Sequence, residues 1–101
     1  MFRRARFADV IDSQLALFLR DHADVLEDVE VRLRAYNDAG RDEAEELYGD
    51  YVDAVETGTE LLADLRDHYA QTLDEPDRYL AEFNRAVARQ LPAFALEIEN
   101  R

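Results

Sequence analysis

Cysteine is absent from this 101-residue chain, and so are lysine and tryptophan. Without cysteine the chain can form no disulfide, no thiolate metal site and no cysteine nucleophile. Serine occurs once, at Ser13, with no histidine one helical turn away, so a serine nucleophile would have no neighbouring base. Only three glycines occur, and no phosphate-binding glycine-rich loop or other catalytic motif is present. We therefore expect no enzymatic activity and no cofactor.

Long hydrophobic runs are also missing, because no apolar stretch approaches the roughly 18 residues that a membrane-spanning helix needs. The chain begins with Arg3, Arg4 and Arg6, as a signal peptide would, but Asp9 and Asp12 interrupt the apolar stretch that would have to follow. The sequence therefore predicts neither an export signal nor a transmembrane helix. It indicates a cytoplasmic protein.

Positive charge is scarce, since 12 basic residues, all of them arginine, stand against 24 acidic ones. The net charge of −12 and the isoelectric point near 4.4 produce a field that repels phosphate backbones and anionic lipid headgroups. We therefore expect no nucleic-acid partner and favour a protein partner over a membrane surface.

What the chain does contain is a hydrophobic pattern with helical spacing. The first series of nine positions spans 29 residues in eight steps, close to the helical period of about 3.6. Its members are Phe7, Ile11, Leu15, Phe18, His22, Val25, Val29, Leu33 and Tyr36. This series predicts a helix over 5–38. A turn near 38–41 follows, because Gly40 readily adopts the left-handed conformation that ends many helices.

The same period continues from Ala44 to Leu73 and predicts a second long helix over 42–73. Pro76, directly after two acidic residues, is typical of the first turn of a helix and predicts the start of a third. The apolar spacing of this third helix continues to Ile98. Pro92 in its interior removes one backbone hydrogen bond, so we expect a bend near 89–92.

These elements predict a single domain over 1–101, an all-α antiparallel up-down-up three-helix bundle with two long helices and a shorter third. The alternative is four or five shorter helices. Asp21 or Asp24 could cap a new helix, and 57–60 matches a helix-capping sequence. We favour three helices because the apolar phase runs unbroken through both places. The third helix is the shortest, so one end of the hairpin formed by the first two should lack a covering partner.

That uncovered end predicts self-association, with a homodimer as the expected assembly and another protein as the alternative partner. The predicted function is accordingly that of a non-enzymatic helical interaction or scaffold protein. Leu17 and Val31 lie off the main apolar stripe, two heptads apart, and are candidates for a contact face. Arg3, Arg4 and Arg6 form the only basic cluster and are candidates for binding an acidic surface of this or another chain. The third alternative is that this segment makes a weak contact with a membrane or an anionic ligand.

A run of acidic residues along the second predicted helix supports an alternative function. Its members are Glu46, Asp50, Asp53, Glu60, Asp64 and Asp67. Like charges one helical turn apart repel, so cations or arginine side chains should offset them. Because carboxylate oxygens are the ligands that hard ions such as Ca²⁺ and Mg²⁺ prefer, the alternative is a divalent-cation-responsive binding protein. A solvated acidic face remains the simpler interpretation.

Overall fold

The computed structural model describes residues 6–101 and places five α-helices and one 3₁₀-helix in that part of the chain. They are α1 (Ala8–Asp21), α2 (Ala23–Asn37), α3 (Ala44–Ala70), α4 (Asp77–Gln90), η1 (Pro92–Phe94) and α5 (Ala95–Glu99). No strand occurs within 6–101. The all-α prediction is confirmed, but three continuous helices are not what forms. The alternative of several shorter helices describes the fold better.

The first predicted helix is divided at His22, whose backbone leaves the helical conformation at φ −125° and ψ 33°. His22 donates its backbone N–H to the Phe18 carbonyl and accepts from the N–H of Val25, so it ends α1 and begins α2. Neither helix has a side-chain cap at this point. The His22 ring still packs 5.3 Å from that of Phe18. The alternative prediction of a new helix near Asp21 and Asp24 is therefore correct here, and the unbroken apolar phase was not evidence for a continuous helix.

The second position considered for a break, around Gly58, lies inside one continuous helix. Thr57 and Thr59 donate their hydroxyls to the carbonyls of Asp53 and Val55, four residues earlier, and cap no helix start. Gly58 is needed for packing instead. A Cβ atom at this position would come within 2.7 Å of Cζ of Phe94, so the missing side chain admits the Phe94 ring.

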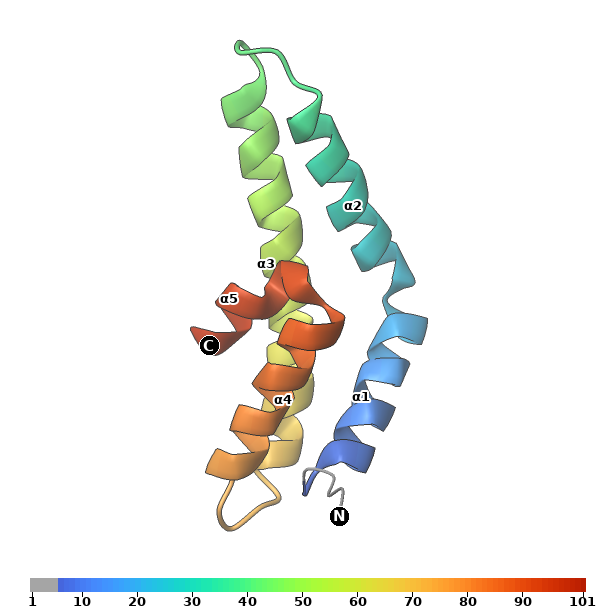
Figure 1. The fold of residues 1–101 in the computed structure, drawn as a ribbon, viewed down its shortest axis with the longest axis vertical. Coiled ribbons are helices and arrows are strands. Elements are labelled where there is room, and N and C mark those ends of the chain that lie inside the picture. The colour runs from blue at the N-terminus through green and yellow to red at the C-terminus, as the bar shows by residue number, and fades with distance from the viewer. Residues whose placement is uncertain (1–5) are drawn as a thin grey trace.

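The predicted bend near 89–92 is a complete break. Leu91 is non-helical at φ −134° and ψ 63°, and Pro92 opens η1 at a position where its missing N–H leaves no helical bond unmade. The chain then turns sharply, so that α5 runs across α3 instead of continuing along it (Figure 1).

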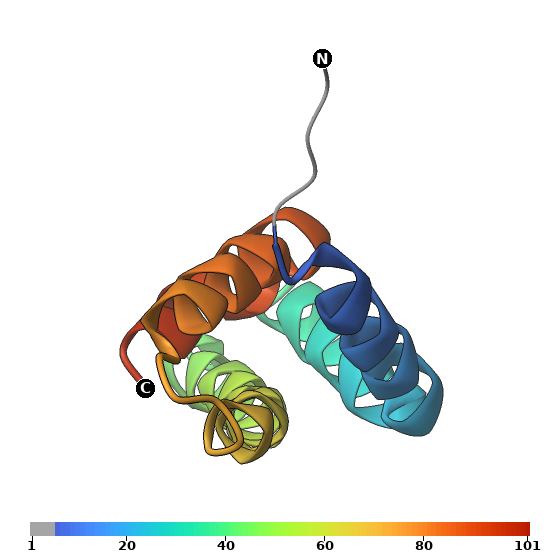
Figure 2. The same cartoon turned by 90° about the horizontal axis from the view of Figure 1, so that it is seen from below.

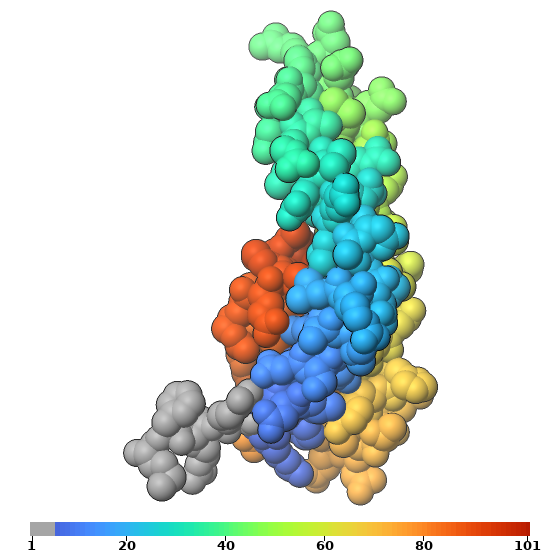
Figure 3. Space-filling model, turned by 90° about the vertical axis from the view of Figure 1, so that its right-hand side faces the viewer, coloured from blue at the N-terminus to red at the C-terminus, as the bar shows by residue number. Residues whose placement is uncertain are grey.

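The molecule is elongated, with principal extents of 52 × 29 × 22 Å. Its radius of gyration of 15.5 Å exceeds the about 13 Å expected of a compact domain of this length. Seen along the long axis, α3, α4 and the α1–α2 pair surround a common centre (Figure 2). The α2–α3 hairpin continues beyond that centre without a third helix beside it (Figures 1 and 3).

We call residues 30–53 the arm and residues 6–29 and 54–101 the body. All sixteen apolar side chains that are buried within 6–101 lie in the body, and no side chain of the arm is buried. The largest fully buried ones are Tyr79, Phe83, Phe94, Leu15, Leu62 and Ile98. The hydrophobic core thus extends along α3 only as far as α4, η1 and α5 cover that helix.

Candidate functional site

One side of the arm carries an exposed group of tyrosines. The ring of Tyr48 lies 5.2 Å from that of Tyr36 on α2 and 6.3 Å from that of Tyr51, one turn further along α3. Tyr48 is 50 % exposed, and Leu33, one turn before Tyr36 on the same side of α2, is 38 % exposed. We call this surface the aromatic face, formed by Leu33, Tyr36, Tyr48, Tyr51 and Val52.

At the base of the arm, the aromatic face meets α5 in a small groove of about 140 Å³. Its lining residues are Tyr48, Tyr51, Val52, Val55 and Glu56 from α3 together with Ala93, Leu96 and Glu97 from η1 and α5. Leu96 is 71 % exposed, the most of any large apolar side chain in the described part of the chain. The exposed apolar surface therefore continues from the arm onto α5.

Three contacts fix α5 in this position. The Phe94 ring fills the space above Gly58, and the Ile98 side chain is fully buried. The guanidinium of Arg66, only 4 % exposed, donates from Nη1 to the Ile98 carbonyl and to Oδ1 of Asn84, both at 3.0 Å. Since α5 has only five residues and could not hold its place alone, these contacts hold Leu96 beside the arm.

The opposite side of the α2–α3 hairpin is polar. Arg32 Nε donates to Asp28 at 3.2 Å, and Arg32 Nη1 lies 3.5 Å from Asp50 Oδ2, where the two side chains bridge the helices. The same three residues line a shallow cavity with Asp53 and Thr57. The arm thus has one aromatic face and one face of exposed ion pairs.

The candidate cation ligands of α3 do not converge on one point. Asp50 pairs with Arg32, Asp67 accepts from Arg66 Nε at 2.8 Å, and Glu60 lies 3.9 Å from Arg101. The remaining three, Glu46, Asp53 and Asp64, are exposed. Over residues 6–101, no group of three or more His, Cys, Asp or Glu side chains is arranged to hold a metal ion. Arginine therefore offsets part of the acidic run.

The other candidate contact residues lie on separate surfaces. Leu17 and Val31 are each 45 % exposed, but they belong to α1 and α2 on either side of the break. Leu17 borders a shallow cavity lined by Leu61 and Leu65 of α3. Of the basic cluster, Arg3 and Arg4 lie outside the described residues. Arg6 is exposed, with its guanidinium carbon 5.3 Å from the centre of the Phe7 ring.

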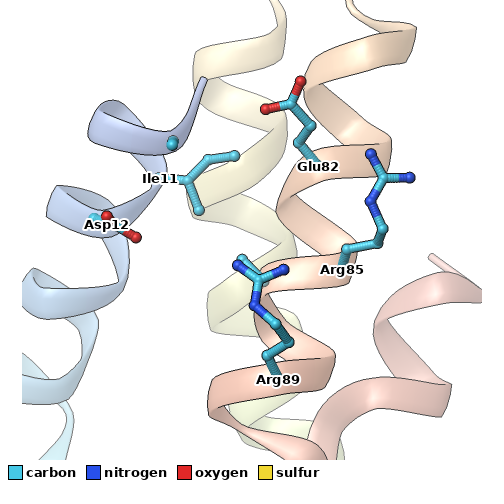
Figure 4. A pocket seen from close by; sticks show the side chains of 7 residues that line it. Ile11, Asp12, Glu82, Arg85 and Arg89 are labelled. Atoms are coloured by element: carbon cyan, nitrogen blue, oxygen red, sulfur yellow. The ribbon is translucent and has the colours of Figure 1, made fainter. Parts of the chain in front are cut away.

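A second cavity, of about 200 Å³, lies between α1 and α4 (Figure 4). It is lined by Ala8, Ile11, Asp12, Glu82, Arg85, Ala86 and Arg89. Sequence reasoning missed it because its two sides are about 75 residues apart in the chain. One signal could have indicated it: among the described α-helices, α4 alone has more basic than acidic residues. The basic residues of α4 are Arg78, Arg85 and Arg89, and its acidic residues are Asp77 and Glu82.

Glu82, 6 % exposed, joins α1 to α4 at this cavity. Its Oε1 accepts the backbone N–H of Phe7 at 2.9 Å, and its Oε2 accepts from Arg78 Nε at 3.1 Å. Burial by itself raises the pKa of Glu82. The hydrogen bonds from Phe7 and Arg78, together with the positive charges of Arg78 and Arg85, outweigh that effect and lower the pKa below its ordinary value of 4.5. The carboxylate is therefore a structural acceptor that fixes the start of α1.

A second polar link between α1 and α4 lies inside the core. The hydroxyl of Tyr79, which is fully buried, donates to Oε1 of Gln14 at 2.9 Å. Burial raises the pKa of Tyr79 to about 12, because the charged phenolate would be poorly solvated, and the bond with Gln14 only partly opposes this. Within 6–101, no buried side-chain nitrogen or oxygen lacks a hydrogen-bond partner.

No helix within 6–101 is both long and apolar enough to cross a membrane. Comparison with known proteins adds no relative, because no protein-family model, no curated protein and no solved structure matches the chain. The aromatic face, with its extension onto Leu96, is the surface that most needs a functional explanation.

Proposed function

We propose that the protein is a non-enzymatic helical interaction or scaffold protein, and that it self-associates through the aromatic face of its arm. The observation that carries this proposal is the contrast in burial along α3. The helix is enclosed from Ala54 onward, whereas residues 30–53 bury no side chain. The largest apolar patch on a monomeric protein, typically about 300–600 Å², is often a functional surface.

The physical reason is that two helices alone cover only one stripe of each other. Secondary-structure layers reach stability by burying their apolar faces against another layer, and the arm has such a layer only at its base. Water around Tyr48 and Leu96 is released when a second apolar surface covers them. This contributes about 25 cal/mol for each Å² covered. A protein surface is the matching partner, since α3 carries eight acidic residues against one arginine and would repel a nucleic acid.

The test is the solution mass by light scattering over about a hundredfold dilution. We expect a dimer at high concentration that dissociates on dilution. The substitutions Tyr48→Ser and Leu96→Ser should each raise the dissociation constant at least about tenfold, because aromatic and well-covered apolar residues dominate interface energies.

Leu17→Ser and Val31→Ser serve as matched controls, because both residues are similarly exposed but lie outside the aromatic face. They should leave the dissociation constant unchanged. A monomer at every concentration would show that the chain does not self-associate. Dissociation by Leu17→Ser or Val31→Ser alone would move the contact from the aromatic face to the outer surface of α1 and α2.

A further inference from the structure

The aromatic face belongs to an apolar stripe of α3 that the rest of the chain covers only in part. Tyr48, Tyr51, Val55 and Gly58 follow one another at helical spacing along this stripe. At Gly58 the stripe is covered by the Phe94 ring, where η1 and α5 cross α3 (Figure 1). Toward the tip of the arm this covering layer stops. Because helices bury an apolar stripe against a neighbouring layer, one more helix beside α5 would complete the bundle here.

The border of the aromatic face is acidic. Glu56 and Glu97 are the charged residues that line the groove at its base. Glu45 precedes Tyr48 by one helical turn, and the arm as a whole carries eight acidic residues against three arginines, a net charge of −5. One of these arginines, Arg32, is held in ion pairs on the opposite side of the hairpin. Such a surface attracts a basic partner more strongly than another acidic one.

We propose that the aromatic face docks a basic amphipathic helix of another protein. This helix lies along α3, continues the layer formed by η1 and α5, and places its apolar stripe on Tyr48, Tyr51 and Leu96. Lysine and arginine side chains at the edges of that stripe pair with Glu56 and Glu97. The inference rests on the proposed interaction function and names the chemistry of the partner, which competes with a second copy for the same face.

The tyrosines give a second reason for a cationic partner. The electron-rich face of an aromatic ring attracts guanidinium and ammonium groups. Tyr48 is half exposed, and its ring already packs against those of Tyr36 and Tyr51 at 5.2 and 6.3 Å. Rings held in this way lose little side-chain freedom when a partner covers them. Basic residues of the partner therefore interact favourably with both the carboxylates and the rings.

A helix fits this surface better than an extended strand. A strand can add only to the edge of a sheet, and residues 6–101 contain no strand. The stripe from Tyr48 to Val55 is about 10 Å long at 1.5 Å for each residue, and Leu96 borders it. About two turns of a helix with apolar residues three or four positions apart cover that length. Because the contact is small, we expect a micromolar dissociation constant.

The test uses a synthetic, fluorescently labelled peptide of about 18 residues, long enough to be helical in water. It has leucine at every third or fourth position and lysine or arginine at most others. Fluorescence anisotropy measures its binding to the full chain, at concentrations below those at which light scattering detects a dimer. A scrambled peptide has the same charge but no apolar stripe, so it should bind at least about tenfold more weakly. A peptide with glutamate in place of the basic residues should not bind.

Substitutions in the aromatic face test where the striped peptide binds. Leu96→Ser and Tyr48→Ser should each weaken its binding at least about tenfold, because well-covered apolar and aromatic residues dominate interface energies. Leu17→Ser is the matched control, since Leu17 is similarly exposed but lies outside the face. Circular dichroism should show the same helix content in all three variants, because each replaces an exposed side chain.

A second set of substitutions tests the acidic border. Glu56→Gln combined with Glu97→Gln should weaken binding of the striped peptide several-fold. Glu27→Gln combined with Asp64→Asn removes the same charge from exposed positions of the body and should have little effect. Equal weakening by the two pairs would show that the peptide responds only to the net charge of the chain, and would overturn the assignment of the groove as its site.

The outcomes separate this inference from the proposed self-association. Equal binding of the striped and scrambled peptides, or unchanged binding by Leu96→Ser and Tyr48→Ser, would overturn docking of a basic helix at the aromatic face. A chain that dimerises but does not bind the striped peptide would have a second copy as the occupant. A chain that stays monomeric and binds the peptide would overturn self-association and support the basic helix. A monomer that binds no peptide would overturn both.

Discussion

The arm and the body share one helix, α3, yet the two halves of that helix have different surroundings. Its apolar positions keep the same helical period from Ala44 to Ala70. In the body these positions are enclosed by the surrounding helices, whereas in the arm they meet α2, water and, at the base, one edge of η1 and α5. The comparison teaches that an amphipathic pattern specifies which face could be buried. The layer packed against that face decides whether it is.

Local stability should follow this difference. The arm buries no side chain, and segments with little buried surface open at low free energy. In the body, by contrast, Phe94, Arg66 and Tyr79 each join elements that are distant in the sequence. Matched substitutions in the two regions therefore test the comparison.

The largest expected effect is that of Phe94→Ala. The Phe94 ring is 1 % exposed, lies over Gly58 and packs edge-on against Phe18 at 6.4 Å, so its removal leaves a cavity at the junction of three elements. We expect a loss of about 3–5 kcal/mol in the free energy of unfolding, measured by urea denaturation. Tyr48→Ala in the arm is the matched control. It should change that free energy by about 1 kcal/mol or less at concentrations where the chain is monomeric. Equal losses in the two variants would contradict the division into arm and body.

The sequence predicted the arm better than the body. The unequal lengths of the predicted helices led to an uncovered hairpin end, and residues 30–53 indeed bury no side chain. A break at Asp21 or Asp24 was only the alternative prediction, because a one-residue interruption that keeps the His22 ring packed against Phe18 does not shift the apolar period. Helical spacing also cannot give the direction that the chain takes after Pro92. It therefore predicted the bend but not the groove at Leu96.

The packing role of Gly58 could not be predicted from the sequence. It depends on a ring 36 residues later in the chain, a contact that no local pattern reports. For the same reason the cavity between α1 and α4 could not be predicted, since Asp12 and Arg85 line the same cavity only in the folded chain. What could be predicted was local period and helix ends. What could not were the contacts that close the body.

A glycine pair should give effects of opposite sign in the two regions. Gly58→Ala places a methyl group against the Phe94 ring, and overpacking of this kind costs about 1–3 kcal/mol, only partly offset by the higher helix propensity of alanine. Gly49→Ala in the arm meets no atom within 4 Å and should stabilise the helix by up to about 1 kcal/mol. Thermal unfolding of both variants measures the difference. Stabilisation by Gly58→Ala would mean that the Phe94 ring moves aside freely.

The smallest expected effect is a loss of folding stability at low pH. It should arise only from the contact between α1 and α4. The folded pKa of Glu82 lies below its ordinary value of 4.5. Its carboxylate therefore contributes stability above pH 4.5 that is lost as the pH falls through the folded pKa. Glu82→Gln keeps an oxygen that can accept from Phe7 but removes the charge, so it should lower the free energy of unfolding at pH 7 by about 1 kcal/mol. Denaturation curves of the two proteins should converge at low pH, where Glu82 is protonated. A constant difference down to that pH would mean that Glu82 acts through its shape and not through its charge.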